Sequence, residues 1–152
     1  MRFASRLPNL LPLALVMAVG VLVGLGGYTF VYARGYSYLS DDPLACVNCH
    51  IMRDNYKSWS VSSHRSVTCN DCHTPHQLAE KYLVKAEHGF AHSWAFTFGD
   101  PQVIQIKSRS LEVVEHNCAS CHEPTITSTF LVATSEDPTC TRCHAGAGHP
   151  PQ

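Results

Sequence analysis

Four copies of one short motif constrain this 152-residue chain more than any other feature. In each copy, two residues separate a pair of cysteines, and a histidine follows the second cysteine directly. The copies contain all eight cysteines of the chain: Cys46-Val47-Asn48-Cys49-His50, Cys69-Asn70-Asp71-Cys72-His73, Cys118-Ala119-Ser120-Cys121-His122 and Cys140-Thr141-Arg142-Cys143-His144. Any fold of this chain must therefore accommodate four such motifs.

The repeated pattern is typical of c-type haem attachment, in which two thiols bind the haem covalently and the adjacent imidazole reaches the iron. Zinc ribbons and disulfides are the alternatives, because the motif pairs also have zinc-ribbon spacing and oxidising compartments favour disulfides. Neither alternative requires a histidine after each pair, and four such histidines would occur by chance in about 2 of 100,000 cases, whereas the haem motif demands them. The sequence predicts four covalently bound haem c groups.

An apolar run from Leu10 to Ala33 precedes the motifs and contains no charged residue. As a helix it would be about 36 Å long, enough to cross a bilayer core of roughly 30 Å. Arg2 and Arg6 before it predict a cytoplasmic segment 1–9, a span 10–33 and an exported part 39–152. This arrangement is a single-pass protein of a bacterial inner membrane, facing the periplasm. A cleaved signal peptide is the alternative, but apolar signal cores usually run about 7 to 15 residues.

The exported part is too poor in aliphatic residues to be stable through an ordinary core. The motifs start 23, 49 and 22 residues apart, which leaves too little chain for a separate domain around each haem. We therefore expect the haems to pack together and replace much of the core. Helices are expected at 77–98 and 109–119, the second capped by Ser108 or Ser110, and no segment alternates like a strand. The predicted fold is all-α: one transmembrane helix and a small haem-packed unit of short helices and loops.

Two longer stretches, together with the anchor and the four motifs, carry a family resemblance: Cys46-Val47-Asn48-Cys49-His50-Ile51-Met52 and Cys69-Asn70-Asp71-Cys72-His73-Thr74-Pro75-His76. The chain resembles the NapC/NirT family of membrane-anchored cytochrome c quinol dehydrogenases, and within it the branch that serves cytochrome c nitrite reductase. The resemblance implies menaquinol as electron donor and a periplasmic catalytic subunit as acceptor. It further implies that this partner donates a lysine ligand to the fourth haem.

The resemblance also implies axial ligands. Met52 would bind the first iron in place of His50, although from the residues alone Met52 could equally be a packing residue. His64 would complete the third haem, and His149 the second. The predicted iron ligands are thus Met52, His64, His73, His122, His144 and His149, with His92 as a further candidate.

One face of the expected helix 77–98 carries Lys81, Lys85, His88 and His92, at intervals of four, three and four residues. The resemblance implies that Lys85 contacts the quinol, and it places an acidic residue where this chain has His92. His92 therefore either binds the first iron or accepts the quinol proton. A solvated helix face is the structural alternative.

Three functional classes compete. The first is a quinol dehydrogenase that feeds a nitrite reductase or another periplasmic reductase, such as one for nitrate or TMAO. The second is a self-contained oxyanion reductase, which would need an open iron, and no motif has lysine in place of histidine. The third is a soluble haem carrier, which the anchor disfavours. The net charge of -1 argues against a nucleic-acid partner, and membrane lipid is expected around the anchor.

Overall fold

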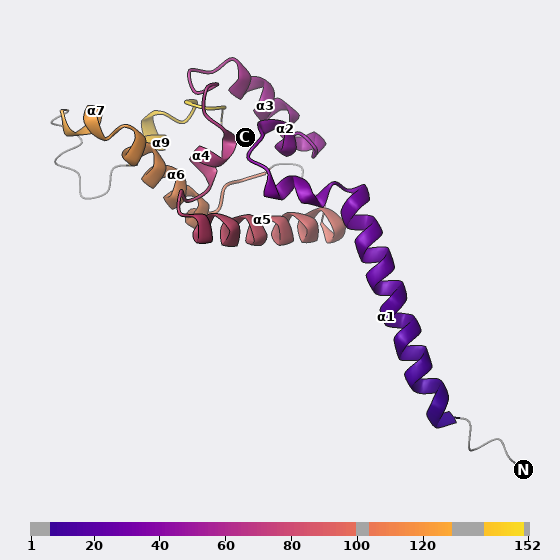
Figure 1. Cartoon of the computed structure of the whole chain (residues 1–152). Helices are drawn as coiled ribbons and strands as arrows, with labels where there is room; N and C mark the ends of the chain where they lie inside the picture. The colour runs from indigo at the N-terminus through magenta and orange to yellow at the C-terminus, as the bar shows by residue number, and fades with distance from the viewer. Residues whose placement is uncertain (1–6, 100–103, 129–138, 151–152) are drawn as a thin grey trace, which may run out of the picture. The chain divides into compact units, whose positions relative to one another are not determined.

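The computed structural model describes residues 7–99, 104–128 and 139–150. The chain divides into two compact units, Met1–Tyr36 and Ser37–Gln152. Figure 1 shows the course of the chain through both.

The first unit contains the long helix α1 (Leu7–Tyr32). Its stretch Leu10–Tyr32 is long and apolar enough to cross a membrane, and none of it is buried within the protein. A helix that is apolar on all sides and exposed is typical of a segment surrounded by lipid. The helix begins three residues before the predicted span and ends one residue earlier than expected.

From Gly35 onward, every described element is helical, and no strand occurs among the described residues, which confirms the all-α prediction. The short elements are η1 (Gly35–Leu39), α2 (Pro43–Cys46), η2 (His50–Met52), α3 (Arg53–Ser60), α4 (Cys69–His73), α7 (Glu123–Thr127) and α9 (Cys140–Cys143).

The two expected helices are present as α5 (Leu78–Phe98) and α6 (Ser108–Cys121). Gln77 is the N-cap of α5, so this helix starts one residue later than predicted. The N-cap of α6 is Lys107, whose backbone is extended, and not one of the two predicted serines. Ser108 is already helical, so its side chain does not fill the capping position.

Each attachment motif includes residues of a short helix or a helix end. α2 ends at Cys46, α4 spans Cys69–His73, α6 ends at Cys121 and α9 spans Cys140–Cys143. A helical turn brings the two thiols of a motif to one side of the chain and puts its histidine close by. Helix α2 contacts α4, α4 contacts α6 and α6 contacts α9 (Figure 1). The four motifs therefore form a spatial row in the same order as in the sequence.

The apolar side chains of the described residues do not form a core among themselves in this unit. Within the described part of the chain, no hydrophobic residue is buried, and the buried residues are Thr74, Lys85 and Asn117. All three carry polar groups, which must be hydrogen-bonded when they are withdrawn from water. Polar contacts between the motif helices therefore do much of the positioning.

Candidate haem-binding site

The first and second motifs are joined by contacts around Asp41, which precedes α2. The side-chain amide of Asn70, on α4, donates to Asp41 Oδ1 at 2.7 Å and to the carbonyl oxygen of Ser40 at 3.2 Å. The thiols of Cys46 and Cys69 also share a hydrogen bond, which lowers the pKa of Cys46 and raises that of Cys69. One attachment cysteine of each motif thus lies directly beside the other.

Asn117 joins the second motif to the third. It lies on α6 beside Cys118, is only 3% exposed, and donates to the carbonyl oxygens of Cys72 at 3.0 Å and Thr74 at 2.9 Å. The hydroxyl of Thr74 in turn donates to the carbonyl oxygen of Asn70 at 2.8 Å. A buried amide that saturates two carbonyls fixes the relative position of α4 and α6, because losing it would leave those groups unpaired.

Glu115 joins the third motif to the fourth. From α6, its carboxylate accepts from the backbone N–H of Cys140 at 2.6 Å, from that of Thr141 at 3.0 Å and from the Thr141 hydroxyl. Burial raises the pKa of Glu115, but the hydrogen bonds from Thr141 and Cys140 outweigh it and lower the pKa overall. An ionised carboxylate at the N-terminus of α9 satisfies N–H groups that a helix start leaves unpaired.

Asp41, Asn117 and Glu115 were not identified from the sequence. They belong to no recognisable motif, and each acts on a segment 24 or more residues away in the chain. For two of them the sequence did offer a signal, which was their position next to the third motif. Asn117 directly precedes Cys118, and Glu115 lies about one helical turn before Cys118.

Two pairs of imidazoles lie at a separation that suits a shared iron. The ring centres of His73 and His149 are 5.9 Å apart with an interplanar angle of 13°, and those of His64 and His122 are 5.9 Å apart. Two imidazoles on opposite sides of one metal ion have centres roughly 6 Å apart, because the metal–nitrogen bond is about 2 Å long. Each pair combines a motif histidine with a predicted distal ligand. The structure brings together the residues that the resemblance pairs, and their ligand roles remain predictions.

The second ring nitrogen of each distal histidine has a backbone partner. Nδ1 of His149 lies 3.2 Å from the carbonyl oxygen of Pro150, and Nδ1 of His64 lies 3.2 Å from that of Ala147. A ring that donates from Nδ1 keeps Nε2 available as a ligand, an arrangement common in metal-binding histidines. Burial, followed by the neighbouring His149, lowers the pKa of His73 to about 4, which keeps that ring neutral. This donor set fits a haem iron, which takes neutral imidazoles.

The first motif offers Met52 or His50 as a ligand, and the fourth offers His144. Met52 is half-buried at the end of η2, and the Asn55 amide nitrogen lies 3.9 Å from its sulfur, whereas His50 is exposed. His144 follows α9 and is exposed. The choice between Met52 and His50 therefore stays open.

Lys85 is held inside the unit by α5 and the segment before α2. Its ammonium donates to the carbonyl oxygen of Ser40 at 2.9 Å and to Asp41 Oδ1 at 3.0 Å, and its side chain is 7% exposed. Lys81 donates to the other oxygen of Asp41 at 2.6 Å, with its side chain 19% exposed. Hydrogen bonds from Lys81 and then Lys85 lower the pKa of Asp41 to about 2. The carboxylate is therefore charged throughout the neutral range.

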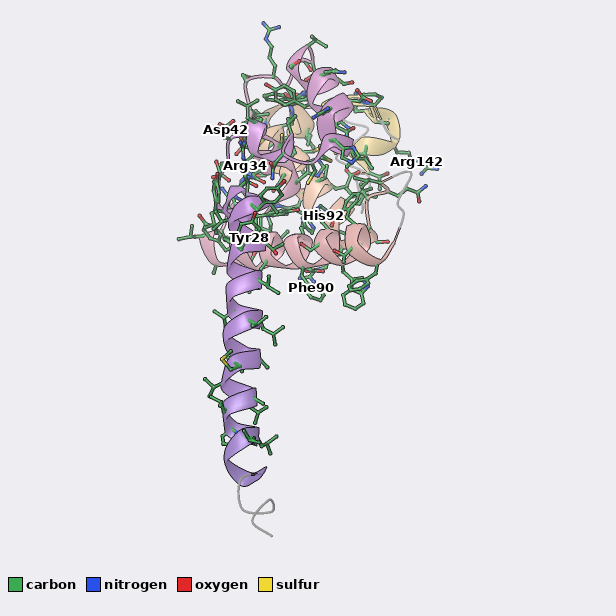
Figure 2. All side chains as sticks on the ribbon, turned by 90° about the vertical axis from the view of Figure 1, so that its right-hand side faces the viewer. Tyr28, Arg34, Asp42, Phe90, His92 and Arg142 are labelled. Carbon is green, nitrogen blue, oxygen red and sulfur yellow. The ribbon has the colours of Figure 1, made fainter. Side chains whose placement is uncertain are left out.

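His92 lies on the same face of α5, and Figure 2 shows it on the opposite side of this helix from Phe90. Its Nδ1 is 2.9 Å from the hydroxyl of Tyr38, and its ring centre is 5.9 Å from that of His88. Burial lowers the pKa of His92 and raises that of Tyr38 to about 12. The sequence placed His88 and His92 on one helix face, but it did not connect Tyr38 with His92, because only the fold shows that contact.

The cysteines do not surround a single ion. Among the described residues, which include all eight cysteines, no group of three or more histidine, cysteine or acidic residues is placed to hold a metal ion. A zinc ribbon would gather four ligands around one ion. The described residues therefore show no zinc-ribbon arrangement of ligands.

A helical unit organised around repeated haem-attachment motifs, following an apolar anchor, defines a membrane-anchored c-type cytochrome. The chain belongs to the NapC/NirT cytochrome c family, whose N-terminal region matches residues 8–152. It carries covalently bound haem c, as its family does.

Several individual proteins are similar to this chain. Cytochrome c-type protein NrfH of Wolinella succinogenes is 38% identical over 119 residues, which cover 76% of this chain and 67% of that protein. Cytochrome c nitrite reductase subunit NrfH of Nitratidesulfovibrio vulgaris is 34% identical over 132 residues, covering 82% and 81%. Cytochrome c-type protein NapC of Paracoccus pantotrophus is 25% identical over 170 residues, covering 88% and 70%.

A solved structure shares the fold. A chain in the crystal structure of the cytochrome c nitrite reductase NrfHA complex bound to the HQNO inhibitor superposes with a TM-score of 0.65. The two chains are 31% identical, and the match covers 90% of each.

Proposed function

We propose that this chain is the tetrahaem quinol dehydrogenase subunit of a cytochrome c nitrite reductase. It takes electrons from menaquinol and passes them to a periplasmic catalytic subunit. The observation that carries the proposal is the row of contacting motif helices α2, α4, α6 and α9, because a series of closely spaced redox groups is what electron transfer requires. The relative named as a cytochrome c nitrite reductase subunit and the solved nitrite reductase complex support the choice of acceptor, since both share more identity with this chain than NapC does.

In this proposal, residues 1–9 are cytoplasmic, residues 10–33 span the bacterial inner membrane and residues 39–152 face the periplasm. The eight motif cysteines attach four haems. Haem c, when bound, supplies a one-electron redox centre at each motif. Met52, His64, His73, His122, His144 and His149 are the proposed iron ligands from this chain, and a lysine of the catalytic subunit completes the fourth site.

Lys85 and His92 are the proposed quinol residues. A quinol gives up two protons with its two electrons, so its site needs a group that binds the oxygen and a group that accepts a proton. The Lys85 ammonium can donate to the quinol oxygen by exchanging one of its two oxygen partners. His92 is kept neutral by burial, which leaves it able to take a proton, and Tyr38 fixes its ring.

The haem number can be measured directly. Intact mass under denaturing conditions should show the 16.8 kDa chain plus four haems of roughly 0.6 kDa each, because each motif forms its own thioether bonds. A population with fewer haems, or bound zinc without haem absorption, would contradict the tetrahaem proposal.

The choice of acceptor is tested by reconstitution. In vesicles that hold the haem-loaded chain with its catalytic subunit, a menaquinol analogue should drive nitrite consumption. The chain alone should have its haems reduced by the same donor and should leave nitrite unchanged. Nitrite consumption by the chain alone would instead identify a self-contained reductase, and a complex inactive towards nitrite would exclude this acceptor.

A further inference from the structure

The outer face of α5 carries an aromatic ridge, formed by Phe90, Trp94 and Phe98. These residues recur at intervals of four, so they lie along one side of the helix. Their rings contact in sequence, with centres 6.2 Å apart for the first two and 4.5 Å apart for the last two. All three are exposed, at 71%, 59% and 72%.

The ridge lies opposite the lysine and histidine face. Trp94 follows His92 by two residues, which is a rotation of about 200° around the helix. Figure 2 shows Phe90 on the side of α5 that points away from the rest of the unit. The contacts that Lys85 and His92 make with the segment before α2 therefore lie on the other face and leave the ridge uncovered.

The exposed area is large for a surface that faces water. Aromatic side chains of about 200 Å² each, exposed to this extent, leave roughly 400 Å² of contiguous apolar surface. This is the size of the largest apolar patch on a typical monomer, and such a patch is often functional.

The chain itself indicates what covers the ridge. Only residues 33–37 separate Tyr38 from Tyr32, the last residue of α1. The Tyr38 ring packs against Gly89 at the middle of α5, where a Cβ atom added to the glycine would lie 3.6 Å from the ring. Six residues span at most about 20 Å. Whatever the orientation of the anchor, the length of the chain therefore limits how far Tyr38, and the middle of α5 beside it, can lie from the end of α1.

We propose that α5 is an interfacial helix, whose ridge Phe90, Trp94 and Phe98 lies in the headgroup region of the bilayer. Tryptophan and phenylalanine are favoured at this depth because their rings are apolar and tolerate a partly wet environment. The ridge occupies the C-terminal half of this face, and just before Phe90 the polar residue Glu87 pairs with Arg109 at 2.9 Å. The ridge would thus hold α5 flat on the lipid, with its lysine and histidine face towards the haems. The inference needs the membrane anchor but does not depend on which reductase accepts the electrons.

Photocrosslinking in native membranes tests this inference. Trp94 or Phe98 is replaced by p-benzoylphenylalanine in the full-length, haem-loaded chain, expressed together with its catalytic subunit and illuminated. Mass spectrometry should then find phospholipid adducts at both positions. Val61 provides the matched control, because it is equally apolar and 79% exposed but lies beyond the end of α3; the same replacement there should give no lipid adduct.

Other outcomes would overturn the proposal. Adducts to a second copy of the chain or to the catalytic subunit would make the ridge a protein interface. Absence of any adduct at both ridge positions, with the haem spectrum unchanged, would place the ridge in water. Because all three outcomes are read from the adduct and not from activity, failure of the proposed quinol function would not be mistaken for failure of this inference.

Discussion

Replacing Lys85 by methionine is expected to slow haem reduction by a menaquinol analogue by roughly two orders of magnitude or more, the usual scale for loss of a hydrogen-bond donor to an oxygen that develops negative charge. Dithionite should still reduce all four haems at the normal rate, because the row of motif helices is left intact. The methionine keeps most of the side-chain volume, and Asp41 remains half-exposed and can be solvated without its partner. The measurement is stopped-flow absorbance of the haems with each donor.

Lys81 supplies a matched control. It binds the other oxygen of the same carboxylate, so replacing Lys81 by methionine removes a comparable ion pair but leaves Lys85 in place. Quinol-driven rates should then stay within a few-fold of the wild type, as expected for a partly exposed ion pair. If both variants lost quinol-driven haem reduction equally, the effect would come from the ion pairs with Asp41 and not from contact between Lys85 and the quinol. Loss of haem from the Lys85 variant would show a structural role instead.

The periodic parts of the fold were predictable from the sequence. The helix 77–98 could be placed to within one residue because Pro75 and Gly99 bound it and its interior is rich in helix formers. The apolar run could be identified as a helix because its length matches a bilayer and it contains no charge. Both inferences use local information, which a single sequence contains.

The contacts between motifs were not predictable in the same way. Asn117 pairs with two carbonyls more than 40 residues away, and Glu115 binds a helix start 25 residues away. Such pairings depend on how the chain returns on itself, which periodicity does not specify. The cap of α6 was misplaced for a different reason, since two serines near its start were equally plausible and neither adopts the extended backbone of a cap.

The candidate site combines both kinds of information. The shared face of Lys85 and His92 follows from helical spacing alone, but the partners that determine their chemistry, Asp41 and Tyr38, lie 44 and 54 residues earlier in the chain. The pairing of His64 with His122 and of His73 with His149 was available only through the family resemblance. The structure adds that each distal ring has a backbone carbonyl at Nδ1.

Removing the last four residues, which include His149, is expected to convert one of the four haems from low-spin to high-spin. Nε2 of His149 is the proposed sixth ligand opposite His73, and without it the iron keeps one strong-field imidazole and at most a water molecule. Electron paramagnetic resonance and the visible absorption spectrum of the oxidised protein measure the change. A shorter truncation that removes only residues 151–152 keeps His149 and should leave all haems unchanged.

Added imidazole separates loss of a ligand from general damage to the fold. In the variant His149→Ala, free imidazole can enter the vacated position and should restore the low-spin spectrum, whereas a misfolded unit would not recover. His64→Ala should behave in the same way at a different haem, so the double variant should show two more high-spin haems than the wild type. Because the His64 ring bonds to Ala147, two residues before His149, it also helps to order the segment that carries His149. An unchanged low-spin spectrum in His149→Ala would remove that residue from the ligand set and leave its approach to His73 as packing alone.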